Sequence, residues 1–413
     1  MLHTGANRRR VVITGMDALS CLGDSLDEIS QSLRIGRSGI VISKEREELG
    51  FRSALTGAIK PVDPAAHFPR KVRKSMGETA LYAAITATKA VAMSGCAEQL
   101  KSDRAGLLIG NDSCADPIEE ILATVRTEKG TGSLGSDKVI KALNSTATIH
   151  LGPMFGTRGI SMSLSGACAS GAHAIGWGWM LITSGMHDLC ITGGSQELCW
   201  QSMAAFDGLR VFSMKLDNPA GAVRPFDRDR DGLVPGGGAA TLILEDYEHA
   251  KRRGAKIIAE VASYAFSSDG DHMTTGDGKG AARCMQQALD SAGLKPSDID
   301  YINAHATGTE AGDTAEAHAI HSVFGENGPP VSSTKSMTGH ECWMAGASEA
   351  LYSLLMMQGG FIAPNKNFEN HDPKLPKLNI AAKPVEGVKL KHVLSNSFGF
   401  GGTNACLVLK AVE

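Results

Sequence analysis

The sequence predicts a layered α/β fold built from two similar halves. Short apolar runs of strand length alternate with longer stretches of helical period, which is typical of strands buried on both faces by helices. A glycine turn feeds an apolar strand twice, in GGGAATLILEDY near 236–247 and in FGGTNACLVLKAV near 400–412. Any α/β chain shows some self-similarity, but we favour a duplication. The polar stretch 245–254 then divides the chain into halves 1–250 and 251–413.

The same alternation assigns the individual elements of each half. In the first half, apolar runs predict strands at 9–16, 105–110, 188–194 and 237–245. Two longer stretches, 74–95 and 169–185, predict helices that end at a glycine suited to a left-handed C-cap. The second half repeats this order with a strand, a helix, a strand, a helix and a final strand, at 255–266, 282–293, 298–309, 344–360 and 404–412.

Composition and charge exclude several classes of function. The 413 residues carry 41 Lys and Arg against 44 Asp and Glu, a net charge of -3, so no electrostatic field favours nucleic acid or an anionic membrane. The start of the chain has too few apolar residues for a signal peptide or a membrane span. Nine cysteines without CxxC pairs indicate reduced thiols rather than disulfides or zinc. We therefore expect a cytoplasmic protein.

Cys168, in SLSGACASGAHAIG, is the candidate nucleophile. It follows a strand-like stretch and stands at the first residues of a predicted helix, where free N–H groups and the helix dipole favour a thiolate. Its glycine and alanine neighbours leave room for a substrate. On its own the motif is equally compatible with an inert buried cysteine.

Two histidines far downstream are candidate partners for Cys168. His305 lies in AHATGTEAGD, and His340 lies in STKSMTGH, five residues after Lys335. A lone histidine is more often structural than catalytic, but two in loops rich in glycine and threonine favour a site. The other eleven histidines receive no role.

Four motifs together carry a family resemblance. GACASGA, AHATGTEAGD, STKSMTGH and SNSFGFGGTNA, in this order and spacing, resemble the β-ketoacyl-acyl carrier protein synthases of the thiolase superfamily, and most of all the type I synthase of dissociated bacterial fatty acid synthesis. RPFDRDRDG and SQELCW are similar to that family too. The resemblance implies a five-layered αβαβα fold, a homodimer, and elongation of an acyl chain by decarboxylative condensation with malonyl-acyl carrier protein. No bound cofactor is implied, because phosphopantetheine arrives on the acyl carrier protein.

In the reaction that the resemblance implies, Cys168 holds the acyl chain as a thioester. The oxygen of the tetrahedral adduct would accept hydrogen bonds from the N–H groups of Cys168 and Phe400, the latter in a turn whose glycines permit the backbone angles. The enolate left by decarboxylation would accept hydrogen bonds from neutral His305 and His340. Loss of carbon dioxide needs no external base, so no paired carboxylates are expected.

The resemblance also assigns supporting and binding residues. Lys335 would hold His340 in position, and Glu316 would balance the charge of Lys335. From the residues alone, Glu316 is better interpreted as a helix-surface carboxylate. Thr307 and Thr309 would hydrogen-bond the phosphopantetheine arm in its tunnel.

The acyl pocket is assigned on the same ground. Phe398 and Phe400 would gate it, although both are compatible with simple core packing. Ser113, in GNDSCADP, is expected to line the pocket, where a small residue would permit long chains.

The resemblance also implies a cation site, and a basic segment is a candidate docking surface for the carrier protein. A monovalent cation would be held by residues that align with the family's ligands, namely Asn303, Glu349, Ser395 and Asn396. DRDRDG imitates the start of a calcium loop, but position 12 is Gly238 instead of glutamate, so we reject calcium. Four basic residues stand at the start of the predicted helix 74–95 and could dock an acidic carrier protein, or equally form a solvated basic face: Arg70, Lys71, Arg73 and Lys74.

Two departures from the family pattern concern the neighbourhood of the histidines. Ala306 stands where the family usually has glycine, and Glu341, Cys342, Trp343 and Met344 replace the usual small residues after His340. The side chains near the predicted site are therefore larger than is usual in the family, so the preferred length of the acyl chain cannot be inferred from the resemblance.

Three other interpretations were weighed against the elongating synthase. Thiolases place a second cysteine where His340 stands, and initiating or chalcone-type enzymes place an asparagine there, so the set of Cys168, His305 and His340 favours decarboxylating elongation. A non-catalytic chain-length factor would not need these residues or Lys335. A ketosynthase of a dedicated polyene or polyketide pathway remains open.

Overall fold

A ten-stranded mixed sheet organises the protein. The computed structural model describes residues 8–270 and 277–412. The strands lie in the order β10-β9-β13-β14-β8-β1-β7-β6-β4-β5. At the centre, β1 (Val11–Leu19) and β8 (Ala259–Ser268) pair antiparallel over three residues of β1 only. The sheet therefore consists of two five-stranded halves joined by a short seam.

The two halves have the same topology. Counted along the chain within each half, the sheet strands lie in the order 1-5-4-2-3 from the seam outward. In both halves the first two pairings are antiparallel and the next two are parallel. The strands beyond the seam are β4 (Ala105–Gly110), β5 (Ser161–Leu164), β6 (Leu189–Gln196), β7 (Gly238–Asp246), β9 (Tyr301–Asn303), β10 (Val331–Ser332), β13 (His392–Gly399) and β14 (Thr403–Lys410). The predicted architecture of two similar halves is confirmed.

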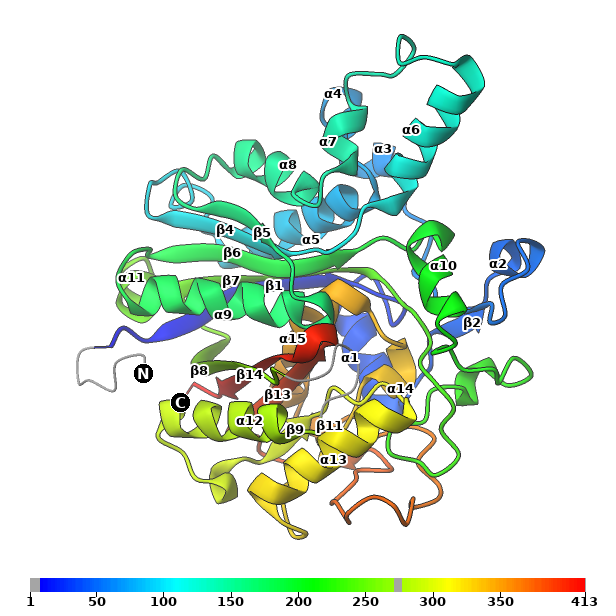
Figure 1. Ribbon diagram of the computed structural model, residues 1–413. Coiled ribbons are helices and arrows are strands. Elements are labelled where there is room, and N and C mark those ends of the chain that lie inside the picture. The colour runs from blue at the N-terminus through cyan, green and yellow to red at the C-terminus, as the bar shows by residue number, and fades with distance from the viewer. Residues whose placement is uncertain (1–7, 271–276, 413) are drawn as a thin grey trace.

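Helices and half-sheets form five layers, which Figure 1 shows from top to bottom. The first outer layer, over the first half-sheet, contains α5 (Glu78–Ser94) and α8 (Thr146–Phe155). The second outer layer contains α12 (Lys279–Ala292) and α13 (Glu310–Phe324). Between the half-sheets lie α9 (Ser170–Thr183) and α15 (Ala345–Gly359), which contact each other. These two central helices follow Cys168 and His340 in the chain, so the fold brings both motifs to the middle of the molecule.

Small residues allow the central helices to pack closely. A methyl group added at Gly171, in the first turn of α9, would lie 2.9 Å from the backbone nitrogen of Ala347 in α15. The predicted helix 169–185 is rich in glycine for this reason. Because its sequence is apolar all round, α9 can be buried between two sheets.

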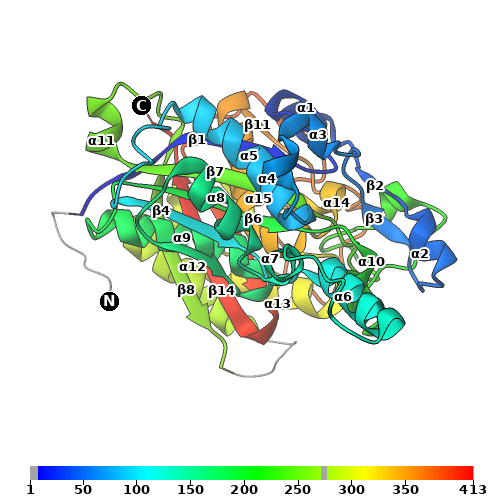
Figure 2. The ribbon, with the colours of Figure 1, turned by 90° about the horizontal axis from the view of Figure 1, so that it is seen from above.

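Several elements lie outside the five layers and were missed in the sequence. An arm made of α6 (Ala115–Glu128) and α7 (Lys138–Ala142) projects from the first half (Figures 1 and 2). α10 (Trp200–Gly208) contacts α6. The short hairpin of β2 (Ile40–Ile42) and β3 (Leu55–Gly57) is a separate two-stranded sheet.

The predicted helix 74–95 needs a correction at its start. The structure begins α5 at Glu78, because Gly77 is extended, and the basic residues belong to a separate short helix, α4 (Arg70–Arg73). Their charges therefore do not oppose the dipole of the long helix.

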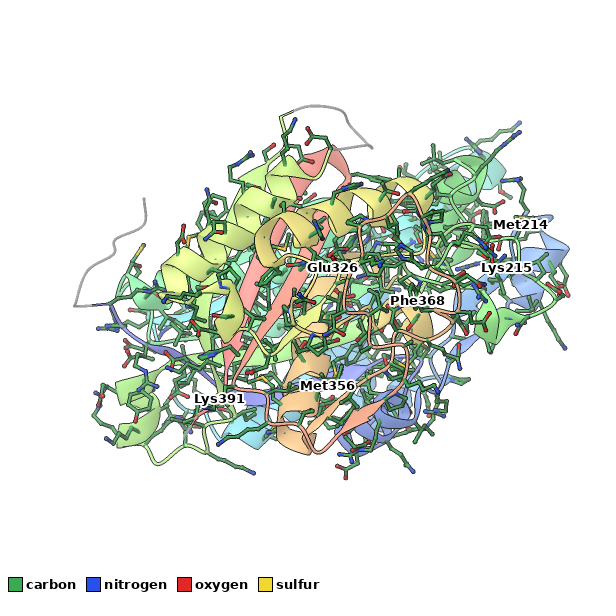
Figure 3. All side chains as sticks on the ribbon, turned by 90° about the horizontal axis from the view of Figure 1, so that it is seen from below. Met214, Lys215, Glu326, Met356, Phe368 and Lys391 are labelled. Carbon is green, nitrogen blue, oxygen red and sulfur yellow. The ribbon has the colours of Figure 1, made fainter. Side chains whose placement is uncertain are left out.

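The remaining helices and strands are short, and most join the layers. They are α1 (Leu26–Ile35), α2 (Lys44–Glu48), α3 (Pro64–His67), α11 (Tyr247–Arg252), α14 (Lys335–Thr338), β11 (Phe361–Ile362) and β12 (Val385–Glu386). From below, Figure 3 shows α12 and α13 side by side, with the segment that carries Phe368 beside α13. Across residues 8–270 and 277–412, no helix has the length and apolar character needed to cross a bilayer.

Candidate active site

Cys168, His305 and His340 meet in one cavity. The cavity has a volume of about 300 Å³, and all three side chains line it. The Cys168 sulfur and one ring nitrogen from each histidine lie within 4.8 Å of one another. Residues separated by up to 172 positions in the sequence (340 minus 168) thus form one cluster, as the sequence predicted.

A tight turn presents the Cys168 sulfur. β5 ends at Leu164, and Ala167, the first residue of the 3-10 turn that leads into α9, adopts a left-handed conformation with φ 47°. The Asp112 carboxylate holds this turn by accepting hydrogen bonds from the N–H of Ala167 at 3.0 Å and from the Ser165 hydroxyl. Sequence analysis missed Asp112, although it stands two residues after the predicted strand 105–110.

Burial decides the protonation of Cys168. Removal from water raises the pKa of the thiol to about 11, although the charge of Lys335 and the N–H groups of Phe400 and Cys168 act in the opposite direction. The N–H groups thus favour the thiolate, as expected, but burial outweighs them, so the thiol keeps its proton at neutral pH. Attack on a carbonyl requires transfer of this proton, and the nearest bases are the two imidazoles.

Both imidazoles are neutral. Burial is the largest cause that lowers the pKa of His305 and of His340 well below 6.5, and the charge of Lys335 acts in the same direction on both. The rings meet edge to face, with centroids 5.3 Å apart. Within the described residues, Nδ1 of both rings and Nε2 of His340 are buried without a hydrogen-bond partner. Neutral rings with free nitrogens can donate to an oxyanion, as the sequence predicted.

The backbone of each histidine is fixed by hydrogen bonds. The N–H of His340 donates to the carbonyl of Val234 at 2.6 Å. The preceding Gly339 has φ 71°, and a methyl group there would lie 2.6 Å from the same carbonyl oxygen. For the other histidine, Glu316 accepts from the N–H of His305 at 2.9 Å and from the next N–H at 2.6 Å.

The partner of Lys335 differs from the expectation. Its ammonium, on a side chain 1% exposed, forms an ion pair with Glu349 of α15 and not with Glu316. Glu316 accepts hydrogen bonds from the backbone around His305 instead, and it interacts with the lysine only through its charge. Burial raises the pKa of Glu316 and of Glu349 to about 7, and Lys335 lowers both.

The turn after β13 brings a second N–H group to the sulfur. The N–H of Phe400 donates to Cys168. Gly401 has φ 81°, so this turn favours glycine. At Gly399 a methyl group would lie 2.8 Å from the carbonyl oxygen of Gly166. The two loops therefore approach as closely as an oxyanion site with two backbone donors requires.

His173 ties the nucleophile helix to this turn, and sequence analysis missed it. Its ring bonds the hydroxyl of Tyr264 at 2.6 Å and that of Thr403 at 2.8 Å. Burial lowers the pKa of His173 to about 4, so it stays neutral in the physiological range. Its place in the helix that directly follows the Cys168 turn was the available signal.

The cavity wall includes the predicted threonines and phenylalanines. Thr307, Thr309, Phe398 and Phe400 all line the cavity. The two threonine hydroxyls are 3.0 Å apart. The Phe398 ring centroid lies 6.0 Å from that of His305, and the Phe400 side chain is 40% exposed. Their positions are compatible with the roles that the resemblance implied.

Ser113 does not line the cavity, contrary to the expectation. Its hydroxyl accepts a hydrogen bond from Nε1 of Trp343 at 3.0 Å. Trp343 packs in the apolar cluster that contains Cys168, and its indole fills the space toward Ser113. The large side chain of Trp343 therefore separates Ser113 from the cavity.

Of the four residues that align with the family's cation ligands, three fit a cation site and one does not. In the described part of the chain, Oδ1 of Asn303, Oε2 of Glu349 and Oγ of Ser395 are buried oxygens without hydrogen-bond partners. Ser395 and Asn303 stand opposite each other in paired strands. The fourth residue is committed elsewhere, since Asn396 donates to Glu316 at 3.1 Å. Oxygen ligands of this kind suit a hard monovalent cation.

The basic residues of α4 lie at the surface. Arg70, Lys71 and Lys74 are exposed, and Arg73 is half-buried. None of the four lines the cavity.

Comparison with known proteins identifies the family. The N-terminal domain of β-ketoacyl synthases matches residues 8–250, and their C-terminal domain matches residues 258–369. The chain belongs to the β-ketoacyl synthase family. The resemblance inferred from the four motifs is confirmed.

Individual relatives extend this β-ketoacyl synthase match over nearly the whole chain. The 3-oxoacyl-[acyl-carrier-protein] synthase 1 of Haemophilus influenzae is 42% identical over 97% of this chain and 99% of that protein. The crystal structure of a β-ketoacyl synthase from Burkholderia phymatum is 36% identical, with a TM-score of 0.93 over 98% of this chain and all of that one. A type II PKS ketosynthase, solved in complex with its acyl-carrier protein and bound to a hexaketide, is 31% identical, with a TM-score of 0.88 and the same coverage.

Proposed function

We propose that this β-ketoacyl synthase elongates an acyl chain by two carbons through decarboxylative condensation with malonyl-acyl carrier protein in fatty acid biosynthesis. The observation that carries the proposal is the cluster of a buried thiol and two neutral imidazoles within 4.8 Å. A nucleophile is supplied for acyl transfer, and two uncharged donors are supplied for an enolate. The thiol and the imidazoles needed for the two half-reactions therefore line one cavity.

In the first half-reaction, the Cys168 sulfur attacks the thioester carbonyl of the acyl carrier. The thiol proton passes to a neighbouring imidazole and then to the departing pantetheine thiolate, so charge balances. The adduct oxygen accepts hydrogen bonds from the N–H groups of Cys168 and Phe400, of which the latter already points at the sulfur. Loss of one such donor typically costs about 10²–10³ in rate.

In the second half-reaction, malonyl carrier loses carbon dioxide. The bond between the carboxylate and the α-carbon breaks, and its electron pair forms an enolate whose oxygen accepts hydrogen bonds from His305 and His340. These bonds strengthen as negative charge develops, which lowers the barrier to decarboxylation. The enolate carbon then attacks the carbonyl of the acyl thioester, the Cys168 sulfur leaves as a thiolate, and a proton taken up from water restores the thiol.

Buried charges support this arrangement. Burial keeps both imidazoles neutral, and the positive charge of Lys335, which is paired with Glu349, acts in the same direction. Glu316 fixes the backbone of His305. Thr307 and Thr309, with hydroxyls at the cavity wall, suit the amides of a phosphopantetheine arm delivered by the carrier, and no cofactor of the protein's own is needed.

Mass spectrometry of the intact protein tests the proposal directly. After incubation with an acyl-acyl carrier protein, we expect one acyl adduct on Cys168, which disappears with addition of malonyl-acyl carrier protein as a β-ketoacyl product forms. Cys168→Ala should show no adduct. A chain-length factor that only binds acyl chains would give neither adduct nor product, and this result would refute the proposal.

The carrier is proposed to dock on the basic residues of α4. Arg70, Lys71, Arg73 and Lys74 supply a positive surface for an acidic protein. In Lys71→Glu/Lys74→Glu, KM for the acyl carrier should rise while kcat changes little. An unchanged KM would remove the docking role and leave a solvated basic face.

We also propose a homodimer formed through the edge strand β5. This strand pairs only with β4 in the described chain, and Ser161 and Met162 are exposed along it. A free strand edge with an exposed apolar side chain is a template for pairing with another copy. Sedimentation should give twice the chain mass of 43.3 kDa. A monomer at micromolar concentration would contradict the proposal.

Three further assignments accompany this function. The halves 1–250 and 251–413 are proposed as structural units carrying Cys168 and the two histidines, respectively, which the repeated topology supports. A cytoplasmic location agrees with nine free thiols. A monovalent cation is proposed at Asn303, Glu349, Ser395 and Asn396, and potassium or sodium should then raise the unfolding temperature above its value in choline at equal ionic strength. Equal temperatures would refute the cation site.

A further inference from the structure

The part of the cavity that is suited to an acyl chain is apolar and begins at Cys168. Beside the sulfur, its walls are formed by Met203, Phe212, Leu233 and Cys342. The same residues form one apolar cluster, so the walls are packed against one another without intervening polar groups. A hydrocarbon chain on Cys168 would gain free energy by leaving water for this space.

Trp343 is the largest buried side chain of this cluster. Its side chain is 7% exposed and belongs to the cluster without lining the cavity. The ring contacts Phe206, with centroids 6.3 Å apart. The indole therefore occupies the space immediately behind the apolar wall.

A hydrogen-bonded chain fixes the indole in this position. Nε1 of Trp343 donates to the Ser113 hydroxyl at 3.0 Å, and that hydroxyl donates to Glu197 at 3.3 Å. The same carboxylate oxygen accepts from the N–H of Ala115, the first residue of α6, at 2.7 Å. Trp343 itself lies in a short 3-10 turn that leads into the buried helix α15. Both the backbone and the side chain of Trp343 are thus held.

We propose that Trp343 supports the end wall of the acyl site from behind, and that this fixed support sets the longest acyl chain that Cys168 accepts. Of the other groups nearby, Phe206 is half-buried and its ring can turn, and the Cys342 thiol is small. The indole is the only bulky group of the described cluster that is both buried and hydrogen-bonded through its side chain. Ser113 is small because it stands behind the wall, where it accommodates the indole instead of the acyl chain.

This inference rests on the proposed function, because it assumes that Cys168 carries the acyl chain. It specifies the substrate class further, as acyl chains short enough to end at the wall that the indole supports. A chain that is longer by one methylene than the site must displace the wall or leave part of itself in water, which typically costs about 10-fold or more in specificity.

Competition between acyl carriers tests the role of Trp343. The protein is incubated with an equimolar series of saturated acyl-acyl carrier proteins of increasing length, and acyl-Cys168 adducts are quantified by intact mass. Wild type should show a sharp fall beyond one length. Trp343→Ala should move this fall to longer chains and raise the ratio of long to short adducts by about 10-fold or more. Trp343→Leu should move it less.

Two controls separate the possible explanations. Ser113→Ala removes the acceptor of the indole but leaves the wall, so it should keep the wild-type length limit. If Trp343→Ala does not fold, Trp343→Leu decides by the same criterion. An unchanged length profile in a folded Trp343 variant overturns the inference. Absence of any adduct in wild type would instead overturn the proposed function.

Discussion

Removal of the buried Lys335 charge is the sharpest test of how the site is supported. Lys335 and Glu349 are both about 1% exposed and form an ion pair. Lys335→Met leaves Glu349 buried without its cation, which typically costs about 3–5 kcal/mol of the free energy of unfolding. Lys335→Met/Glu349→Gln removes the orphaned charge as well, so it should recover a large part of that loss.

A matched control distinguishes the two candidate partners. Lys335→Met/Glu316→Gln removes the carboxylate that the sequence had paired with the lysine, but Glu316 bonds the backbone of His305 instead. This variant should be no more stable than Lys335→Met. Urea unfolding near pH 8, followed by circular dichroism, measures all four proteins. Recovery with Glu316→Gln and none with Glu349→Gln would refute the assignment of the pair.

The other predictions concern the turns and charges around the cavity. Gly399→Ala should slow acylation of Cys168 by about 10²-fold, because its methyl group would lie 2.8 Å from a backbone carbonyl oxygen and displace the donor turn; an unchanged acylation rate by mass spectrometry would contradict this. His173→Phe should lower the free energy of unfolding by about 1–3 kcal/mol, because the Thr403 hydroxyl loses its partner; equal urea midpoints for variant and wild type would argue against it. For Glu341, burial raises the pKa from 4.5 to about 7, so the folded state holds a proton that the unfolded state releases, and stability falls as pH rises from about 4.5 through 7 by up to about 3 kcal/mol. Glu341→Gln should make this part of the stability profile less steep, although Glu316 and Glu349 titrate in the same range, and an equally steep profile in urea unfolding would rule the explanation out.

The strands and helices of the layered core could be predicted because each is marked by a pattern within its own segment of the sequence. Buried strands such as 105–110 are continuous apolar runs, and both central helices carry the small residues that their packing demands. The arm was missed because its pattern is weak: Pro117 is the one residue of α6 described as buried, so no apolar stripe marks the helix. Tertiary contacts with α10, not periodicity, place this segment.

The sequence predicted the reacting residues of the site better than it predicted the residues that hold them in position. Cys168 and the two histidines stand in distinctive motifs, whereas the partner of Lys335 depends on how α14 and α15 meet in space. The contact between Trp343 and Ser113 joins positions 230 residues apart. The raised pKa of Cys168 depends on burial, which the local sequence does not reveal, and burial outweighs the favourable position at the start of a helix.

The central claim is that the two imidazoles, and not the thiol, drive decarboxylation in the shared cavity. The most direct measurement is carbon dioxide release from malonyl-acyl carrier protein by Cys168→Ala, alone and combined with His305→Ala or His340→Ala. We expect Cys168→Ala to release carbon dioxide, and each added histidine substitution to slow release by about 10²-fold or more. Release at an undiminished rate after both histidines are replaced would contradict the account.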